Sequence, residues 1–120
     1  MESELSLLRT LIEAQAHELQ TVRHELGVLQ DKDEIQRLQY AYGFFIDNRM
    51  FREMADLFAD EGAYMEIGGR GLYRGKERIH RFLREVRGEG RWGLATDEVI
   101  NHVQEQLLIT VEPDRRRARA

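Results

Sequence analysis

The histidine at position 102 has the clearest potential for chemistry in this sequence. It lies in a stretch of alternating polar and apolar residues, on the same predicted face as Gln104 and Gln106, while Val103 and Leu107 lie on the other face. Because an ordinary histidine changes its charge near neutral pH, such a ring can accept and release protons in catalysis. Two interpretations remain open: the polar face either lines a cavity or is exposed to solvent.

Composition and spacing exclude several other kinds of site. The chain has no cysteine, which removes disulfides, thiolate nucleophiles and cysteine zinc sites. His17 and His24 are seven residues apart, about 10 Å along a helix, so they cannot hold one metal ion together. No two of the four histidines have chelating spacing, and we expect no metal site.

The glycine-rich stretch 68–77 lacks two requirements of a phosphate-binding loop. Arg70 stands where that motif has its first glycine, five residues before Gly75-Lys76. Glu77 stands where a serine or threonine follows the lysine. The glycines therefore predict a hairpin turn followed by the start of a helix.

The charge balance argues against nucleic acid and membrane partners. The chain has 22 acidic and 18 basic residues, a formal net charge of -4, whereas nucleic-acid binders usually show a basic excess. The arginines of residues 115–119 lack interleaved aromatic residues and are interpreted as a solvated strand edge. The acidic start does not fit a signal peptide, and no apolar run approaches the ~20 residues that span a bilayer. We expect a cytoplasmic protein.

Residues 5–29 carry a heptad repeat. Its a and d positions are Leu5, Leu8, Ile12, Gln15, Leu19, Val22, Leu26 and Leu29, all apolar but one. Glu4 and Glu18 occupy g positions, and Arg9 and Arg23 occupy the e positions five residues later, which face them in a parallel pair. The sequence predicts an N-terminal helix within residues 1–30 that either forms a coiled coil or docks onto its own domain.

Residues 31–120 are predicted to form the globular α+β domain. Gly27 and the Asp31–Asp33 cluster indicate the end of the first helix, and Asp31 with Glu34 resembles a capping box that starts a second one ending near Asp47. The expected elements that follow are a short helix near residues 50–58, strands at 63–67 and 71–74, a helix at 76–87 with Val86 in its buried stripe, a loop at 88–98, a long strand at 99–111 and the opening of another at 115–120. So few strands leave one face and one edge of a sheet poorly covered. Either another subunit completes the sheet or, as we expect, the chain is a fragment lacking the last strands.

Several blocks of the domain share an order and spacing with a known family. They are residues 33–38, Tyr42, Asp47, residues 55–60, residues 71–76 and Asn101-His102. Through them, residues 31 to about 114 resemble the SnoaL-like branch of the nuclear transport factor 2-like superfamily, which includes scytalone and bile-acid dehydratases. The helix ahead of the domain also resembles a leader found in some members.

The resemblance implies a cone-shaped fold, in which a strongly curved mixed sheet wraps around helices and leaves a deep pocket. Such domains commonly dimerise sheet to sheet, so we expect a homodimer through the sheet, through residues 5–29, or through both. The family contains cofactor-free lyases and isomerases, among them dehydratases and polyketide cyclases, and also members that catalyse nothing known. The sequence therefore predicts either an enzyme acting on a small apolar carbonyl compound or a non-catalytic ligand-binding or dimerisation module.

The resemblance also implies three catalytic residues: Tyr42 as a donor to the substrate carbonyl, Asp47 as the partner of a histidine, and His102 as the general base. A further acid or histidine is expected from strands beyond residue 120. Tyr42 and Asp47 are five residues apart, about 7.5 Å along a helix, so they could contact different parts of one ligand. The alternatives are packing for Tyr42 and helix capping for Asp47. The residues expected to line the ligand pocket are Phe45, Tyr64, Trp92 and Gln104.

Overall fold

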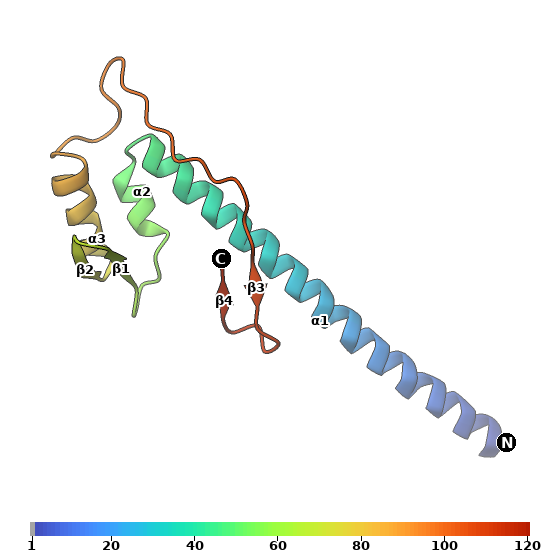
Figure 1. The fold of residues 1–120 in the computed structure, drawn as a ribbon. Helices are drawn as coiled ribbons and strands as arrows, with labels where there is room; N and C mark the ends of the chain where they lie inside the picture. The colour runs from blue at the N-terminus through green and yellow to red at the C-terminus, as the bar shows by residue number, and fades with distance from the viewer. Residues whose placement is uncertain (1) are drawn as a thin grey trace. The chain divides into compact units, whose positions relative to one another are not determined.

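A computed structural model describes residues 2–120, with side chains from residue 3 onward; Met1, the first residue of the predicted N-terminal segment, lies outside this range. The elements are α1 (Glu2–Asp47), α2 (Phe51–Asp56), β1 (Tyr64–Ile67), β2 (Gly71–Arg74), α3 (Lys76–Phe82), the π-helical turn η1 (Leu83–Arg87), β3 (Thr110–Val111) and β4 (Ala118–Arg119) (Figure 1). Helices and two small antiparallel sheets together place the fold in the α+β class. The chain forms two compact units, one of residues up to Gln36 with 108–120 and one of Arg37–Leu107.

The first unit contains most of α1, and here the predicted break between two helices is wrong. The helix continues through Gly27 and Asp31, because glycine weakens a helix by about 1 kcal/mol but does not end it. A Cβ atom at Gly27 would overlap the guanidinium of Arg115, which lies across the helix at this point. The carboxylate of Asp31 accepts two hydrogen bonds from Arg115, at 2.7 and 3.0 Å. Asp31 is therefore an ion-pair partner inside a helix and not a helix cap.

The C-terminal hairpin of strands β3 and β4 completes the first unit. Thr110 pairs with Arg119, and Arg115 has a left-handed backbone at φ 59° in the connecting loop. The imidazole Nε2 of His24 donates a hydrogen bond to the carbonyl oxygen of Pro113 at 2.6 Å. The predicted strand opening near the C-terminus is confirmed as β4. The predicted strand over residues 99–111 is wrong for most of its length, since only its last two residues join a sheet.

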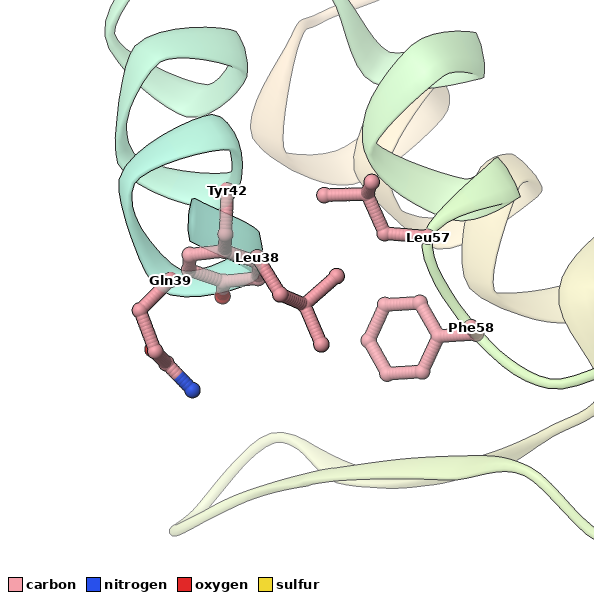
Figure 2. Close-up of a pocket in the computed structure, with 5 residues that line it drawn as sticks. All are labelled: Leu38, Gln39, Tyr42, Leu57 and Phe58. Carbon is pink, nitrogen blue, oxygen red and sulfur yellow. The ribbon is translucent and has the colours of Figure 1, made fainter. Parts of the chain in front are cut away.

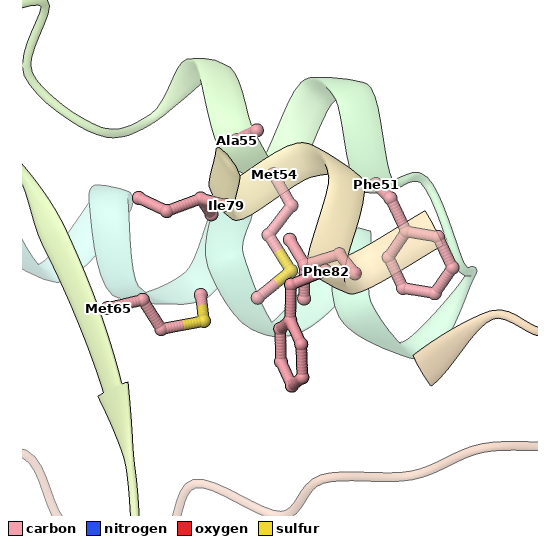
Figure 3. Close-up of a cluster of buried hydrophobic side chains, with 7 residues drawn as sticks. Phe51, Met54, Ala55, Met65, Ile79 and Phe82 are labelled. Carbon is pink, nitrogen blue, oxygen red and sulfur yellow. The ribbon is translucent and has the colours of Figure 1, made fainter. Parts of the chain in front are cut away.

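The second unit packs around one small hydrophobic core (Figure 3). Its buried residues come from α2, β1, α3 and η1 and are Phe51, Met54, Ala55, Met65, Ile79, Phe82 and Leu83. Strands β1 and β2 pair antiparallel, as predicted, with Met65 opposite Tyr73. Tyr73 in turn stacks on Phe82 with ring centroids 4.1 Å apart, which joins the sheet to α3.

The end of α3 departs from the predicted regular helix. Residues Leu83–Arg87 form a π-turn, in which hydrogen bonds span five residues, and the backbone N–H of Gly88 donates to the carbonyl of Leu83 at 2.7 Å. The wider turn moves Val86 off the buried stripe, so the prediction that Val86 is buried is wrong. Gly88 follows the turn directly, as predicted for the end of this helix.

Candidate functional site

The last residue of α1 forms the most specific polar contact of the second unit. The carboxylate oxygen Oδ1 of Asp47 accepts two hydrogen bonds from His102, one from the backbone N–H at 2.9 Å and one from ring Nδ1 at 2.7 Å. One oxygen thereby holds both the backbone and the ring of the same residue. This double contact fixes the position and the rotation of the imidazole.

The contact also assigns the proton on the ring. An ionised carboxylate can only accept hydrogen bonds, so Nδ1 of His102 must carry the hydrogen. In the neutral ring, Nε2 then keeps its lone pair and is the basic atom. Catalytic histidines that act as general bases are commonly oriented by a carboxylate in this way.

An extended segment carries His102 along the end of α1. Two residues further on, the side-chain amide of Gln104 donates to the carbonyl of Gln39 at 3.2 Å. A Cβ atom at Gly43 would lie 2.9 Å from that amide, so the absence of a side chain at Gly43 permits the contact. The alternation of polar residues thus reflects an extended segment, residues 98–104, that lies along α1; we call this segment the strap. It is not a strand of a sheet at this point.

A small pocket of about 80 Å³ lies beside His102. Its lining residues are Ile46, Arg49, Phe51, Leu83, Arg87, Ile100 and His102. The His102 side chain is 44% exposed, so the pocket opens to solvent at the imidazole. A pocket of this size fits the reacting end of a ligand and not its whole body.

Arg49 is a site residue that no sequence pattern indicates. Its backbone is left-handed, at φ 52°, directly after α1, a conformation that is costly for any side chain beyond glycine. The largely buried Nε of Arg49 lies 2.7 Å from Oε1 of Glu98 as an ion pair, without the alignment of a good hydrogen bond. Glu98 precedes His102 by four residues, so this pair and the Asp47 contact fix the same segment at two points. No sequence motif marks such a long-range pair.

Tyr42 lines a different pocket, of about 280 Å³ (Figure 2). Its other lining residues are Leu38, Gln39, Leu57 and Phe58. Five residues along a helix correspond to a rotation of about 140°, so Tyr42 and Asp47 project from different sides of α1. The structure therefore brings Asp47 and His102 together but places Tyr42 at a separate cavity.

Burial sets the protonation of Tyr42. Burial raises the pKa of the Tyr42 phenol, so this side chain is protonated and a hydrogen-bond donor at neutral pH. The charge of Arg87, which lines the His102 pocket, acts in the opposite direction on the same phenol. The tyrosine thus lies within electrostatic reach of that guanidinium.

The residues predicted to line the ligand pocket lie in separate places, and neither pocket includes any of them. Phe45 packs against the hydrophobic core, and the Gln104 amide binds the backbone of α1. Tyr64 and Trp92 are exposed, and the guanidinium of Arg74 lies 6.0 Å from the centre of the Tyr64 ring.

No group of three or more histidine, aspartate or glutamate side chains within residues 3–120 is arranged to hold a metal ion. Among the helices that the structure describes, none has the length and apolar character to cross a membrane.

The fold and the pockets define a small α+β domain with an oriented imidazole–carboxylate pair beside a small pocket. The chain belongs to the family of SnoaL-like domains, whose model matches residues 27–120. The family predicted from the sequence blocks is thereby confirmed. A comparison with curated proteins found no match.

Proposed function

We propose that this domain binds a small, mostly apolar carbonyl compound and that the Asp47–His102 pair acts on it as a general base. The reaction class is a dehydration, isomerisation or cyclisation without a cofactor. The observation that carries the proposal is the double hydrogen bond from one Asp47 oxygen to His102, at 2.9 and 2.7 Å. We further propose that the domain has the cone-shaped sheet of its family, with both pockets facing the inside of the cone.

The proposed step begins at Nε2 of His102. Its lone pair takes a proton from the carbon next to the carbonyl group, and the electrons of that C–H bond move onto the carbonyl oxygen as an enolate. In a dehydration, the enolate then expels a hydroxyl group from the β-carbon, which leaves as water with the proton from the imidazolium. In an isomerisation, the same proton is returned to the γ-carbon. Asp47 stabilises the imidazolium between the two steps.

Arg87 is proposed to stabilise the developing negative charge, and Tyr42 is proposed to bind the ligand at the other pocket. The guanidinium of Arg87 lines the pocket beside His102 and forms no ion pair within residues 3–120. A fixed cation at this position favours an enolate over the neutral ketone. The protonated phenol of Tyr42 is the proposed donor to the ligand in the larger pocket, where Leu38, Leu57 and Phe58 surround the apolar body.

The test uses two ketones of the required chemistry, because they report proton removal directly. 4-Hydroxybutan-2-one and cyclohex-3-en-1-one are incubated with the full chain in D2O, and proton NMR follows both deuterium exchange next to the carbonyl and product formation. We expect His102→Gln to lower the rate by about 10²–10⁴-fold, the usual contribution of a general base. The control is His80→Gln, which removes a histidine that lines neither pocket.

Asp47 is a positioning residue, so its test needs a second readout. Asp47→Asn should lower kcat with little change in KM, and ¹⁵N NMR should show the His102 ring losing its single tautomer. Equal rates for wild type and His102→Gln would contradict the proposal, as would ¹⁵N shifts that place the hydrogen on Nε2 in the wild type.

Ligand binding without catalysis is the second candidate function, and the Tyr42 pocket favours it. Its volume of about 280 Å³ is close to the lower limit for small-molecule sites, and four of its five lining residues offer apolar surface. In this case cyclohex-3-en-1-one should shift the NMR signals of Leu57 and Phe58 without being converted. Tyr42→Phe should weaken this binding, because it removes the hydroxyl and keeps the ring.

A further inference from the structure

The heptad face of α1 is an exposed apolar surface that the proposed function does not use. We define the seam as the a and d positions of residues 5–29. Its seven apolar side chains, Leu5, Leu8, Ile12, Leu19, Val22, Leu26 and Leu29, are each between 49% and 65% exposed. We propose that this seam pairs with the seam of a second copy of the chain, parallel and in register.

The continuity of α1 makes the seam a single surface. Because the helix does not break at Gly27, Leu29 remains in line with the earlier seam positions. The seam extends over 25 residues, about 37 Å at 1.5 Å per residue. Apolar residues repeated every 3.5 positions over this length are the pattern by which two helices supercoil around each other.

The C-terminal hairpin leaves the seam open. It contacts α1 at His24, Gly27 and Asp31, through Pro113 and Arg115. In the heptad frame, residues 24 and 31 occupy f positions and residue 27 occupies a b position, all on the outer face of a two-stranded coiled coil. The hairpin thus covers the outer face of α1 and leaves the seam, through which a dimer would form, exposed.

The charges beside the seam favour a second copy as the partner, in parallel orientation. In a parallel pair each g residue faces the e residue five positions later on the partner. Glu4 then faces Arg9, and Glu18 faces Arg23, with no like charges opposed. In an antiparallel pair g faces g and e faces e, which brings glutamates against glutamates and arginines against arginines. The sequence is therefore complementary to itself in one direction only.

The one polar seam residue favours exact register. Gln15 occupies a d position near the middle of the seam. With the two helices aligned, Gln15 lies opposite Gln15 of the partner subunit, and the two amides can hydrogen-bond to each other. A shift by one heptad would instead bury each amide against apolar residues, with no partner for its donors.

The first test measures the mass of the full chain by sedimentation equilibrium. We expect a mass twice the 14.1 kDa of one chain. The combined variant Leu8→Asp and Leu19→Asp, at a d and an a position, should be monomeric at concentrations where the wild type is dimeric. The matched control places the same two charges at c positions, Leu7→Asp and Thr21→Asp, and should remain dimeric. A monomeric wild type, or a dimer that survives the seam variant, would overturn the proposal.

The second test changes only exposed charges and therefore does not endanger the fold. Glu18→Arg alone should weaken the dimer, because it brings two arginines together, and adding Arg23→Glu should restore it. Orientation follows from cross-linking, which the absence of native cysteine makes unambiguous. Leu8→Cys should form a disulfide between two identical chains. Cross-linking of Leu8→Cys only when mixed with Leu26→Cys, the a position that an antiparallel partner would place opposite it, would show antiparallel pairing and refute the parallel seam.

Discussion

Gly88 is the position where adding one methyl group tests the packing beside the candidate site most directly. It has an ordinary backbone, at φ -92° and ψ -6°, so alanine meets no conformational barrier there. The new Cβ would lie 2.9 Å from the carbonyl oxygens of Arg84 and Arg91 and would overlap the ring of Phe51. Two of these neighbours are backbone atoms, which cannot rotate away, and Phe51 is a core residue that also lines the His102 pocket.

The expected size of the effect follows from two opposing contributions. Overpacking of a buried position costs about 1–3 kcal/mol. Replacing glycine with alanine also restricts the unfolded chain and returns about 0.4–1 kcal/mol where the backbone permits it. We therefore expect Gly88→Ala to lower the free energy of unfolding by about 1–2 kcal/mol. For a unit of this size each 1 kcal/mol corresponds to a fall of about 4–8 °C in Tm.

The assay compares urea and thermal unfolding of Gly88→Ala with those of Gly68→Ala. Gly68 also lacks a positive φ, but a Cβ atom there has no neighbour within 4 Å, so this control keeps only the gain from the unfolded state. It should be as stable as the wild type or slightly more stable. If the two variants unfold at the same urea concentration, the packing around Gly88 is not as the structure describes it and the reasoning is refuted.

Two predictions concern pH. The two hydrogen bonds from Arg115 lower the pKa of Asp31 below 3.8. Docking of the C-terminal hairpin on α1 should therefore be complete above pH 3.8 and be lost as the pH falls through the folded pKa. NMR signals of the hairpin measure this loss of docking, and Arg115→Gln should abolish the transition. Burial, helped by the charge of Arg52, lowers the pKa of His80 below 6.5, and its Nδ1 accepts a hydrogen bond from Arg52 at 2.9 Å. This contribution to stability should be present above pH 6.5 and disappear as the pH falls through the folded pKa, so the Tm should drop as the pH is lowered below 6.5. His80→Asn should lack this pH dependence, and an unchanged profile in that variant would contradict it.

Local patterns predicted most of the short elements correctly. The alternation around Met65 predicted the strand that contributes it to the core, and the helical spacing of Ile79, Phe82 and Leu83 predicted the buried stripe of α3. These predictions succeed because each depends only on which residues of one short segment face a core. Val86 escaped the same reasoning because the helix changes to a π-turn after Phe82.

The errors arise where a residue far along the chain decides the local structure. Gly27 is typical of a helix end, but here it makes room for Arg115, which is 88 positions later in the sequence. Alternation predicted a strand around His102, but alternation shows only that a segment is extended and not whether another strand lies beside it. Its actual partners are Asp47 and the Gln39 carbonyl on α1. Pairing of this kind has no local signature.

The candidate site was predictable in type but not in geometry. Position along the helix placed Tyr42 and Asp47 about 7.5 Å apart, whereas the rotation of about 140° between them directs one side chain to the larger pocket and the other to His102. Both the distance along the helix axis and the rotation about it are needed before two residues can be assigned to one ligand.

The orientation of His102 depends on a segment that is held by charges and has little buried surface of its own. Around it, Val99 and Val103 are exposed, so hydrophobic burial does not fix the strap. Its position rests on three polar contacts, of Glu98 with Arg49, of His102 with Asp47 and of Gln104 with the Gln39 carbonyl. Because Arg49 also adopts a costly left-handed backbone there, the end of α1 is specialised to receive this segment. Loss of the Arg49–Glu98 pair should therefore loosen the imidazole, although the hydrogen bonds of the ring are to Asp47, and this makes the ion pair part of the site.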